Sequence, residues 1–463
     1  MASKMEMRYR VVNPTTGEIV EEFPSASDGE VETALARAAS AFNRWRAVPI
    51  GERAAMVARI GQLFVERAEE LGAAATMEMG KSLASAIGEA RFCGMIFDYY
   101  ASNGPALAAD EPIKPLAGGQ AIIQRLPIGA LLGVMPWNYP SYQVARFTAP
   151  NLVLGNVILL KHSESCPRSA LALERIMVDS GLPDGAYINV FASHTQIAKM
   201  IADRRIAGVS FTGSDRAGAV IGELAGRNLK KSVLELGGSD AYVVLDAQDV
   251  KAAAAAAWKT RMTNLGQACN SNKRIIVMDR IFDSFVRELV ALAIALKPGD
   301  PKASLTGEFG PLSTRAAAKK LREQVSDAVD NGATLHVGGA LLDGPGAYFQ
   351  PAVLTGVTPD MRAWREELFG PVAVVYRVSN DDEAVALANA TEFGLGGAVF
   401  SEDLSRARRV AEQLESGMAN INTSAGEGPD IPFGGVKRSG YGRELGPLGM
   451  DEFCNRRLLY TAG

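Results

Sequence analysis

The chain has 463 residues, of which 47% are hydrophobic and 22% charged, with a formal net charge of −4 and an isoelectric point near 5.7. This length exceeds what one hydrophobic core usually serves, so two or three domains are expected. The acidic balance gives no electrostatic case for binding nucleic acid or an anionic membrane. No apolar run approaches the roughly 20 residues that span a bilayer, and residues 1–8 contain no signal-peptide core.

Cysteines and histidines are scarce, which limits the chemistry. Four cysteines are too scattered for a disulfide framework, and three histidines lack the spacing of a zinc site. We therefore expect no metal and a location in the reducing cytoplasm.

The first half of the chain alternates between helical and strand patterns. Residues 28–89 repeat apolar positions at helical spacing, and 120–126 is a strand of a projecting ribbon, after a turn at 115–119. From residue 128, repeated βαβ units predict a parallel, doubly wound sheet. The expected strands are 130–135, 157–160, 187–190 and 208–212, and the expected helices are 141–154, 168–179, 195–202 and 215–228.

A second α/β region is expected further along. Its strands are 274–278, 334–337 and 372–378, and its helices are 251–258, 282–296 and 315–331. Residues 455–460 could form a final strand that adds to the sheet of another subunit. The sequence thus predicts two α/β regions and a small β element.

Polar side chains follow three of the expected strands, where doubly wound sheets bind their ligands. Asn138 lies between two prolines, which also suits a rigid turn. Lys161 and Glu164 could hydrogen-bond ribose hydroxyls, or form a solvated strand end. Residues 211–214 lead from a strand into a helix whose free N–H groups could face a pyrophosphate, while Ser214 suits a helix cap. The usual G-x-G-x-x-G fingerprint is missing.

Cys269 and Glu235 are the candidate reactive groups. Cys269 lies among glycine and amide residues, whose N–H groups could lower the pKa of its thiol, although most lone cysteines are buried and inert. Glu235 stands between two leucines and before Gly237, where partial burial would raise its pKa toward that of a general base. A polar strand face is the alternative for Glu235.

Two later loops complete the pattern. Residues 366–371 place an acid and an aromatic before a tight turn, and 433–444 is rich in glycine. These stretches, with those around Asn138, Lys161, Ser214, Glu235 and Cys269, occur in the order and spacing of the aldehyde dehydrogenase superfamily. Essentially the whole chain closely resembles that superfamily.

The resemblance implies an architecture and an assembly. It implies a doubly wound, Rossmann-like NAD-binding domain (1–110 and 129–234) and a second α/β catalytic domain (235–432). A small β element (111–128 and 445–463) would bridge subunits in a homodimer or homotetramer.

The resemblance also implies roles for individual residues. The Cys269 thiolate would attack an aldehyde carbon, and the Asn138 amide and the Cys269 backbone N–H would hold the oxyanion. Hydride would pass to the nicotinamide, and Glu235 would then activate water to release the acid. The residues implied to contact the cofactor are Trp137, Lys161, Ser163, Glu164, Gly213, Ser214, Leu236, Gly237, Glu367 and Phe369.

The cofactor is expected to be NAD, with NADP possible. Glu164 favours NAD, because its carboxylate would repel a 2′-phosphate. His162 stands where many relatives have proline, which would alter the ribose loop.

The substrate is expected to be a small aldehyde that carries an anion. The chain is most similar to the bacterial succinate-semialdehyde dehydrogenase type, which has an arginine at Arg146 for the substrate carboxylate. The second arginine of that type is replaced by Thr263, with Arg261 nearby. Enzymes that oxidise salicylaldehyde-like aromatics also have an arginine at Arg146, and a solvated helix charge is the structural alternative.

The same residues bear on three other interpretations. A cysteine thioester or ester hydrolase needs no cofactor, so it would have no use for the residues expected to bind ribose and pyrophosphate. A CoA-acylating aldehyde dehydrogenase generally lacks an acid at the position of Glu235. A binding protein on an enzyme fold would not need Cys269, Glu235 and Asn138 together.

Overall fold

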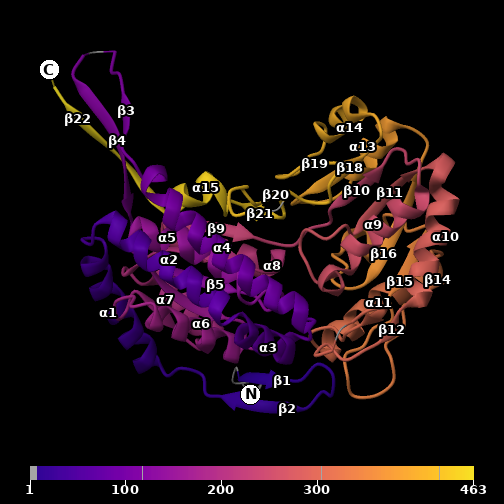
Figure 1. The fold of residues 1–463 in the computed structure, drawn as a ribbon, viewed down its shortest axis with the longest axis horizontal. Coiled ribbons are helices and arrows are strands. Elements are labelled where there is room, and N and C mark those ends of the chain that lie inside the picture. Colours follow the sequence, from indigo (N-terminus) through magenta and orange to yellow (C-terminus); the bar gives the residue numbers. More distant parts are fainter. Residues whose placement is uncertain (1–7, 117, 304, 427, 463) are drawn as a thin grey trace.

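The computed structural model describes residues 8–116, 118–303, 305–426 and 428–462. Two α/β bodies lie side by side, and an antiparallel ribbon projects from the first (Figure 1). Residues 1–7 and Ala117 of the expected turn lie outside the described residues. No helix among the described residues is long and apolar enough to cross a bilayer.

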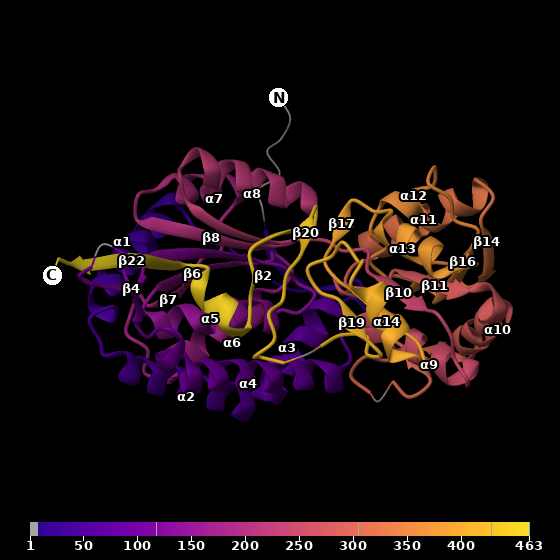
Figure 2. The same cartoon turned by 90° about the horizontal axis from the view of Figure 1, so that it is seen from above.

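The first body is built on the sheet β21-β9-β8-β5-β6-β7. The strands β5 to β9 are parallel, and β21 pairs antiparallel with β9. Figure 2 shows α7 and α8 on one face and α5 and α6 on the other, with α2 and α4 beyond. The strands are β5 (Ala130–Met135), β6 (Val157–His162), β7 (Tyr187–Asn189), β8 (Ile206–Thr212), β9 (Lys231–Glu235) and β21 (Gly440–Tyr441). The covering helices are α5 (Tyr142–Leu154), α6 (Pro167–Asp179), α7 (His194–Ala202) and α8 (Asp215–Arg227).

The N-terminal part packs around this sheet. The helix α1 begins with a capping box, in which Ser27 and Glu30 satisfy each other's backbone N–H groups. A hairpin that the sequence analysis did not predict precedes α1. These elements are β1 (Tyr9–Val12), β2 (Ile19–Phe23), α1 (Asp28–Trp45), α2 (Ile50–Glu66), α3 (Ala68–Met79) and α4 (Leu83–Leu107).

The second body is built on the sheet β14-β15-β16-β11-β10-β18-β19, which is parallel except for the pair β14 and β15. Its strands are β10 (Ala241–Val244), β11 (Arg274–Met278), β14 (Thr334–Val337), β15 (Ala352–Thr355), β16 (Val372–Val378), β18 (Gly397–Phe400) and β19 (Asn420–Ile421). Its helices are α9 (Val250–Met262), α10 (Asp279–Ala295), α11 (Arg315–Asp330), α12 (Arg362–Arg365), α13 (Asp381–Asn389) and α14 (Leu404–Ala411). Short elements are the 3-10 turn η1 (Thr263–Gly266) and the strands β12 (Lys297–Pro298), β13 (Glu308–Phe309), β17 (Phe393–Gly394) and β20 (Val436–Lys437).

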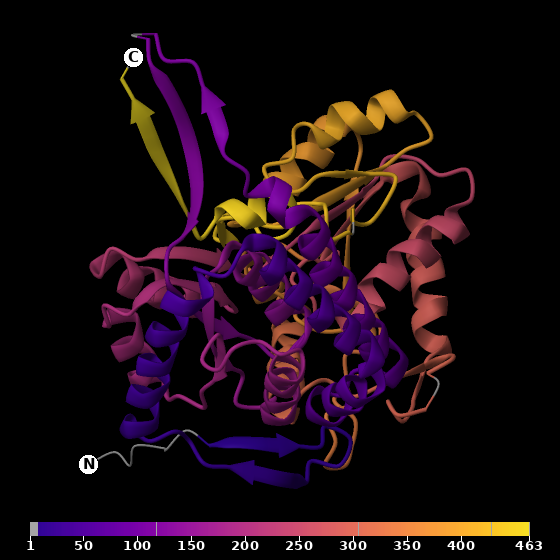
Figure 3. The same cartoon turned by 60° about the vertical axis from the view of Figure 1, so that its left-hand side comes forward.

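The last part of the chain returns to the first body. After β20 and β21, the helix α15 (Gly446–Asp451) contributes Met450 to the first hydrophobic core. The ribbon then consists of β22 (Cys454–Thr461), β4 (Gln120–Pro127) and β3 (Glu111–Ile113), paired antiparallel. Figure 3 shows this ribbon standing clear of both bodies.

The α/β class predicted from the sequence is confirmed, and the differences are local. The strand β6 runs on through Lys161 to His162, because these residues pair with Val134 and Met135 of β5. Lys161 therefore lies on a buried strand rather than in the loop after it. The short strands β10, β15, β18 and β19 were not predicted, because two to four residues carry little periodic signal.

Candidate functional site

Most of the predicted site residues lie where the strands of the first sheet end and face the second body. The strands β5, β6, β8 and β9 are parallel, so the segments that follow them leave at one edge. Cys269 belongs to the loop between α9 and β11 in the second body. It lines a cavity of about 660 Å³ between the two bodies, together with Arg146, Asn264 and Phe433.

The loop that carries Cys269 has an unusual backbone. Asn264, Leu265 and Gly266 are successive left-handed residues, with φ of 48°, 54° and 71°. Glycine is required at 266, since a Cβ there would lie 2.3 Å from the Gly370 carbonyl oxygen. Strain of this kind, about 1–3 kcal/mol per residue, persists only where surrounding contacts impose it, as they do at functional sites.

The Cys269 thiol differs from the expectation that nearby N–H groups would lower its pKa. Burial raises its pKa to about 11, although the charges of Arg146 and Lys273 act in the opposite direction. The free protein therefore holds the thiol mostly protonated at neutral pH, and the cations around it limit the cost of forming a thiolate.

Asn138 is buried beside this loop. Its side-chain Nδ2 donates to the Gln267 carbonyl at 3.2 Å, and Asn264 Nδ2 donates to the Asn138 carbonyl at 2.9 Å. Its Oδ1 has no hydrogen-bond partner among the described residues. The amide of Asn138 is thus held against the loop at Gln267, two residues before Cys269 in the chain.

The start of α5 is fixed by a carboxylate that the sequence analysis missed. Glu89 Oε1 accepts from the backbone N–H groups of Ser141 and Tyr142, at 2.9 and 3.0 Å. Its other oxygen pairs with buried Lys81. Because Ser141 lies three residues after Asn138, Glu89 anchors the Asn138 loop. A lone acid inside an amphipathic helix gives no signal of such a role.

Glu235 is the last residue of β9 and is buried. Neither of its carboxylate oxygens has a hydrogen-bond partner among the described residues. Burial raises its pKa well above the usual range, and Arg146 opposes the shift. A Cβ on Gly434 would meet its Oε1 at 2.6 Å, and a Cβ on Gly238 would meet the Cys269 carbonyl at 2.4 Å. The 235–238 segment and Cys269 are therefore brought together, and Glu235 has the properties of a general base.

Arg146 lies in the cavity wall, but its guanidinium is covered. Its side chain is 0% exposed and forms an ion pair with Glu444. The rings of Phe433 and Tyr142 lie over the guanidinium, with centroids 4.5 and 5.0 Å from its central carbon. The solvated-helix alternative is therefore excluded, and a substrate carboxylate would touch Arg146 only if a ring moved.

Arg261 differs from the expectation that it contacts the substrate. It is fully buried and does not line the cavity. It donates to the carbonyls of Val372, Leu368 and Gly370 and to the Ser271 hydroxyl. These bonds use its guanidinium to hold the 368–372 segment against the Cys269 loop.

The residues predicted to bind adenosine ribose surround a second cavity of about 380 Å³, lined by Lys161, Ser163, Glu164 and His194. Lys161 and Glu164 form an ion pair. Burial alone would raise the pKa of Glu164, but the Lys161 ammonium outweighs it and the pKa lies below its usual range. Apart from Thr212, the other lining residues, such as Phe211 and Ile221, are apolar and suit the flat face of a base.

His162, where many relatives were expected to have proline, links two loops. Its Nδ1 accepts from the Ser163 N–H at 2.8 Å, and its Nε2 lies 2.9 Å from the Pro140 carbonyl. Burial lowers its pKa to about 4. The neutral ring therefore donates to Pro140 and ties the ribose loop to the Asn138 loop.

The remaining predicted cofactor residues lie along the boundary of the two bodies. Trp137 and Phe369 meet edge to face at 5.7 Å. Glu367 Oε1 accepts from the Gly238 N–H at 3.1 Å, and a Cβ on Gly237 would meet Glu367 Oε2 at 2.6 Å. Ser214 caps α8, as its alternative role predicted.

The residues Gly213 and Leu236 support this boundary through the backbone. The N–H of Gly213 donates to the Glu235 carbonyl, and the N–H of Leu236 donates to the Ser439 carbonyl, both at 3.0 Å. The bonds join the β8–α8 turn, the end of β9 and the glycine-rich loop of 433–444.

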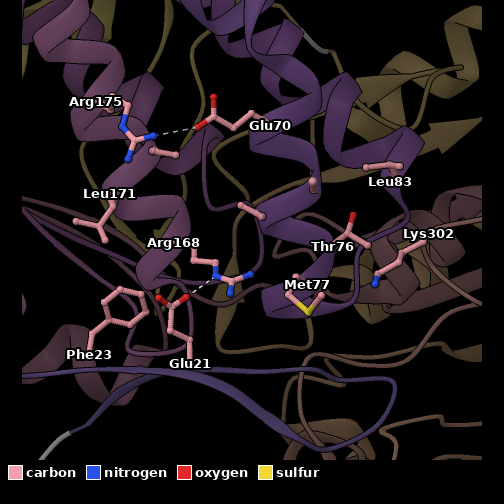
Figure 4. Close-up of a pocket in the computed structure, with 13 residues that line it drawn as sticks. Glu21, Phe23, Glu70, Thr76, Met77, Leu83, Arg168, Leu171, Arg175 and Lys302 are labelled. Atoms are coloured by element: carbon pink, nitrogen blue, oxygen red, sulfur yellow. Dashed lines mark hydrogen bonds and ion pairs between the residues drawn. The ribbon is translucent and has the colours of Figure 1, made fainter.

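A further cavity of about 620 Å³ opens among β2, α3 and α6 (Figure 4). Arg168 faces Glu21 at 2.6 Å, and Arg175 faces Glu70 at 3.8 Å. Both arginines are thus balanced by a carboxylate, and the predicted reactive groups do not line this cavity.

A thiol, a buried carboxyl without a hydrogen-bond partner among the described residues, and two cavities near the strand ends are the parts of a pyridine-nucleotide-dependent oxidoreductase. The chain belongs to the aldehyde dehydrogenase family, whose model matches residues 1–459.

Relatives at high identity span nearly the whole chain. A succinate-semialdehyde dehydrogenase (NADP(+)) of Deinococcus radiodurans is 52% identical over 458 residues, covering 99% of this chain and 96% of the relative. A Mycobacterium tuberculosis protein named succinate-semialdehyde dehydrogenase (NADP(+)) 1 is 43% identical, covering 98% and 100%. The crystal structure of succinic semialdehyde dehydrogenase from Streptococcus pyogenes in complex with NADP+ has a TM-score of 0.95 at 38% identity, covering 98% and 100%. This chain is therefore an enzyme that oxidises aldehydes with a pyridine nucleotide.

Proposed function

We propose that this enzyme oxidises succinic semialdehyde to succinate with NADP+, through a covalent intermediate on Cys269. The observation that carries the proposal is the buried Glu235 carboxyl, which has no hydrogen-bond partner among the described residues and begins the segment that packs on Cys269. The names of the relatives support the substrate and the nucleotide.

The reaction needs, in this order, a thiolate, a hydride acceptor and an activated water molecule. The Cys269 thiol loses its proton to solvent, the resulting thiolate attacks the aldehyde carbon, and the Asn138 amide and the Cys269 N–H stabilise the oxyanion of the thiohemiacetal. The bound nicotinamide supplies the hydride acceptor, and loss of hydride leaves a thioester on Cys269. Glu235 removes a proton from water, which adds to the thioester and releases the carboxylic acid and the thiolate.

We propose that the second, smaller cavity takes the adenosine and its 2′-phosphate. The expected preference for NAD rested on repulsion by Glu164. In the structure the Lys161 ammonium pairs with that carboxylate, and His194 lies 3.9 Å from it. If Glu164 turns away, Lys161 and Ser163 remain to meet a phosphate.

The nucleotide preference is tested by binding rather than by activity. Dissociation constants for NADP+ and NAD+ are measured with the wild type and with Glu164→Gln. We expect the wild type to bind NADP+ more tightly, and the variant to improve NADP+ binding more than NAD+ binding. If the wild type bound NAD+ more tightly than NADP+, the preferred nucleotide would be NAD+.

We propose that Arg146 attracts the carboxylate of the substrate through its charge. Its guanidinium balances one buried carboxylate, Glu444, and is covered by Phe433 and Tyr142. Arg146→Ala should raise KM for succinic semialdehyde much more than for butanal, because butanal carries no anion. Equal increases in KM for both aldehydes would mean that the Arg146 charge acts only on the thiol and Glu235, and not on the substrate.

A second candidate substrate class is an aromatic aldehyde. Phe92, Tyr139, Tyr142 and Phe433 line the cavity and could pack on a ring. A panel of succinic semialdehyde, salicylaldehyde and butanal, each with NADP+ and NAD+, separates these classes through kcat/KM.

We expect Cys269→Ala to abolish oxidation while nucleotide binding persists; retained oxidation would rule out this thiol as nucleophile.

We also propose the division into the cofactor domain (1–110 and 129–234), the catalytic domain (235–432) and the bridging element (111–128 and 445–463). The ribbon supports the last part, because Leu458, Leu459 and Tyr460 are exposed on it. Light scattering of a chain with these three residues changed to serine, compared with the wild type, tests whether the ribbon joins subunits.

A further inference from the structure

Lys273 lies four residues after Cys269, and nothing in the sequence pattern separated it from the polar loop around it. Its side chain is 2% exposed. The ammonium donates to the carbonyl of Ala268 at 2.8 Å and to that of Cys269 at 2.7 Å. It also forms an ion pair with Glu367 Oε1 at 2.9 Å. An ammonium has three donors, and these three acceptors use all of them.

Two of these acceptors belong to parts of the site that must meet in the reaction. The carbonyl of Cys269 belongs to the proposed nucleophile, and Glu367 is one of the residues that the family resemblance implies to contact the cofactor. Glu367 Oε1 also accepts from the Gly238 N–H at 3.1 Å. Gly238 in turn touches the Cys269 carbonyl closely enough that a Cβ there would lie 2.4 Å away. One buried cation therefore joins the nucleophile loop, the Glu367 loop and the segment after Glu235.

We propose that Lys273 is a positioning residue for the oxidation step, which holds the Cys269 peptide and the Glu367 carboxylate in one fixed arrangement and supplies positive charge beside the thiol. The inference rests on the proposed role of Cys269 and deepens it. With Oε1 held by Lys273 and Gly238, Glu367 keeps Oε2 for a ribose hydroxyl. The same ammonium contacts the Cys269 carbonyl, and its charge favours the thiolate of that residue.

The charges that face Cys269 come from several elements. Arg146 on α5 and Lys273 on the nucleophile loop favour the thiolate, whereas Glu367 and Glu235 disfavour it. The Lys273 charge also acts to lower the pKa of Asp240, which follows the Glu235 segment. Neutralising Lys273 removes one of two cations and leaves the acids in place, so the thiolate should become harder to form.

The experiment compares Lys273→Met, which removes charge and donors, with Lys273→Gln, which keeps donors without charge. The control is Arg274→Met, a buried cation at the next position that donates to the carbonyls of Ser239, Leu387 and Ala388. The readout is the rate at which iodoacetamide alkylates Cys269 between pH 7 and 10 without nucleotide, located by mass spectrometry. The full chain is used, and melting curves establish that each variant is folded.

We expect both Lys273 variants to alkylate about tenfold more slowly at a given pH, with the profile displaced upward by about one unit, the usual effect of one close charge. Arg274→Met should keep the wild-type profile. A wild-type profile in either folded Lys273 variant would overturn the role of the charge.

The link to Glu367 has its own readout. Lys273→Met and Glu367→Gln should each weaken NADP+ binding severalfold, and the double variant should bind no more weakly than Glu367→Gln alone. Additive losses would overturn the proposal that Lys273 acts through Glu367. Cys269→Ala that still oxidised aldehydes would instead refute the proposed function, so the two failures are distinguishable.

Discussion

Replacing Gly434 by alanine tests whether Glu235 delivers water to the thioester. Gly434 lies in the glycine-rich loop and has φ of +150°, a conformation that favours glycine. A Cβ there would lie 2.6 Å from Glu235 Oε1 and 2.7 Å from the Gly442 carbonyl oxygen. The Glu235 carboxylate is the end of a flexible side chain and moves most easily, whereas relief of the carbonyl contact needs a small shift of the loop backbone.

The size of the effect follows from these distances. Ordinary contact begins at 3.4 Å, so Oε1 must retreat by about 0.8 Å (3.4 − 2.6). A misplacement of about 1 Å in a reacting group can cost on the order of 10²-fold in rate. The unfavourable φ adds about 1–3 kcal/mol of strain, which lowers the melting temperature without touching Cys269 directly.

The assay is rapid mixing with aldehyde and NADP+, followed by the near-ultraviolet absorbance of reduced nicotinamide. Hydride leaves before the thioester is hydrolysed, so Gly434→Ala should give a burst of about one equivalent per site and then turn over about 10²-fold more slowly than the wild type. In a Glu235→Gln background the same substitution should add little. Gly226→Ala, where a Cβ meets nothing within 4 Å, is the control and should be kinetically unchanged.

Loss of the burst itself would refute the reasoning. It would mean that alanine disturbs attack by the thiol or hydride loss rather than the water step. If folded Gly434→Ala turned over at the wild-type steady rate, Glu235 would not be the group that activates water for hydrolysis of the thioester.

Further predictions concern the thiol, the base and the buried arginine. Glu235→Gln should accumulate an acyl group on Cys269, visible as a mass increase of the intact protein; turnover at the wild-type rate would remove Glu235 from the mechanism. Since burial raises the pKa of Cys269 to about 11 from 9.0, its alkylation should rise about tenfold per pH unit without levelling by pH 10. The folded pKa is the higher one, so this thiol's contribution to stability is complete below pH 9 and is lost as pH rises through 11; a plateau near pH 8 would contradict both statements. Arg261→Met should lower the free energy of unfolding in urea by about 3 kcal/mol, because it leaves buried carbonyls unpaired, while the ratio of kcat/KM for succinic semialdehyde and butanal stays constant. A selective loss for succinic semialdehyde would restore a substrate role to Arg261.

The sequence could predict which residues lie at strand ends wherever the βαβ pattern is regular. Asn138 and Glu235 follow or end strands of a βαβ pattern, and parallel pairing alone places strand ends at one edge. Cys269 was found through its small and polar neighbours.

What the sequence did not predict depends on contacts between distant segments. Arg146 was expected to face the substrate, but its partners are Glu444, almost 300 residues later, and two rings that cover it. Arg261 lay near the nucleophile in sequence, yet its donors point to the 368–372 carbonyls. Which side of a helix or loop faces a cavity is decided by such packing, and local residue types carry little information about it.

The return of residues 433–453 to the first body constrains how a ribosome can make this protein. The strand β21 completes the edge beside β9, Glu444 balances Arg146, and the Phe453 carbonyl accepts from Asn156 Nδ2 at 2.9 Å. All three partners follow β19, the last strand of the second sheet, in the chain. Until nearly all of the chain has been translated, the first body therefore has Arg146 without its partner Glu444 and a sheet whose β9 edge is unpaired. Chaperones that shield such edges would be most needed during this interval.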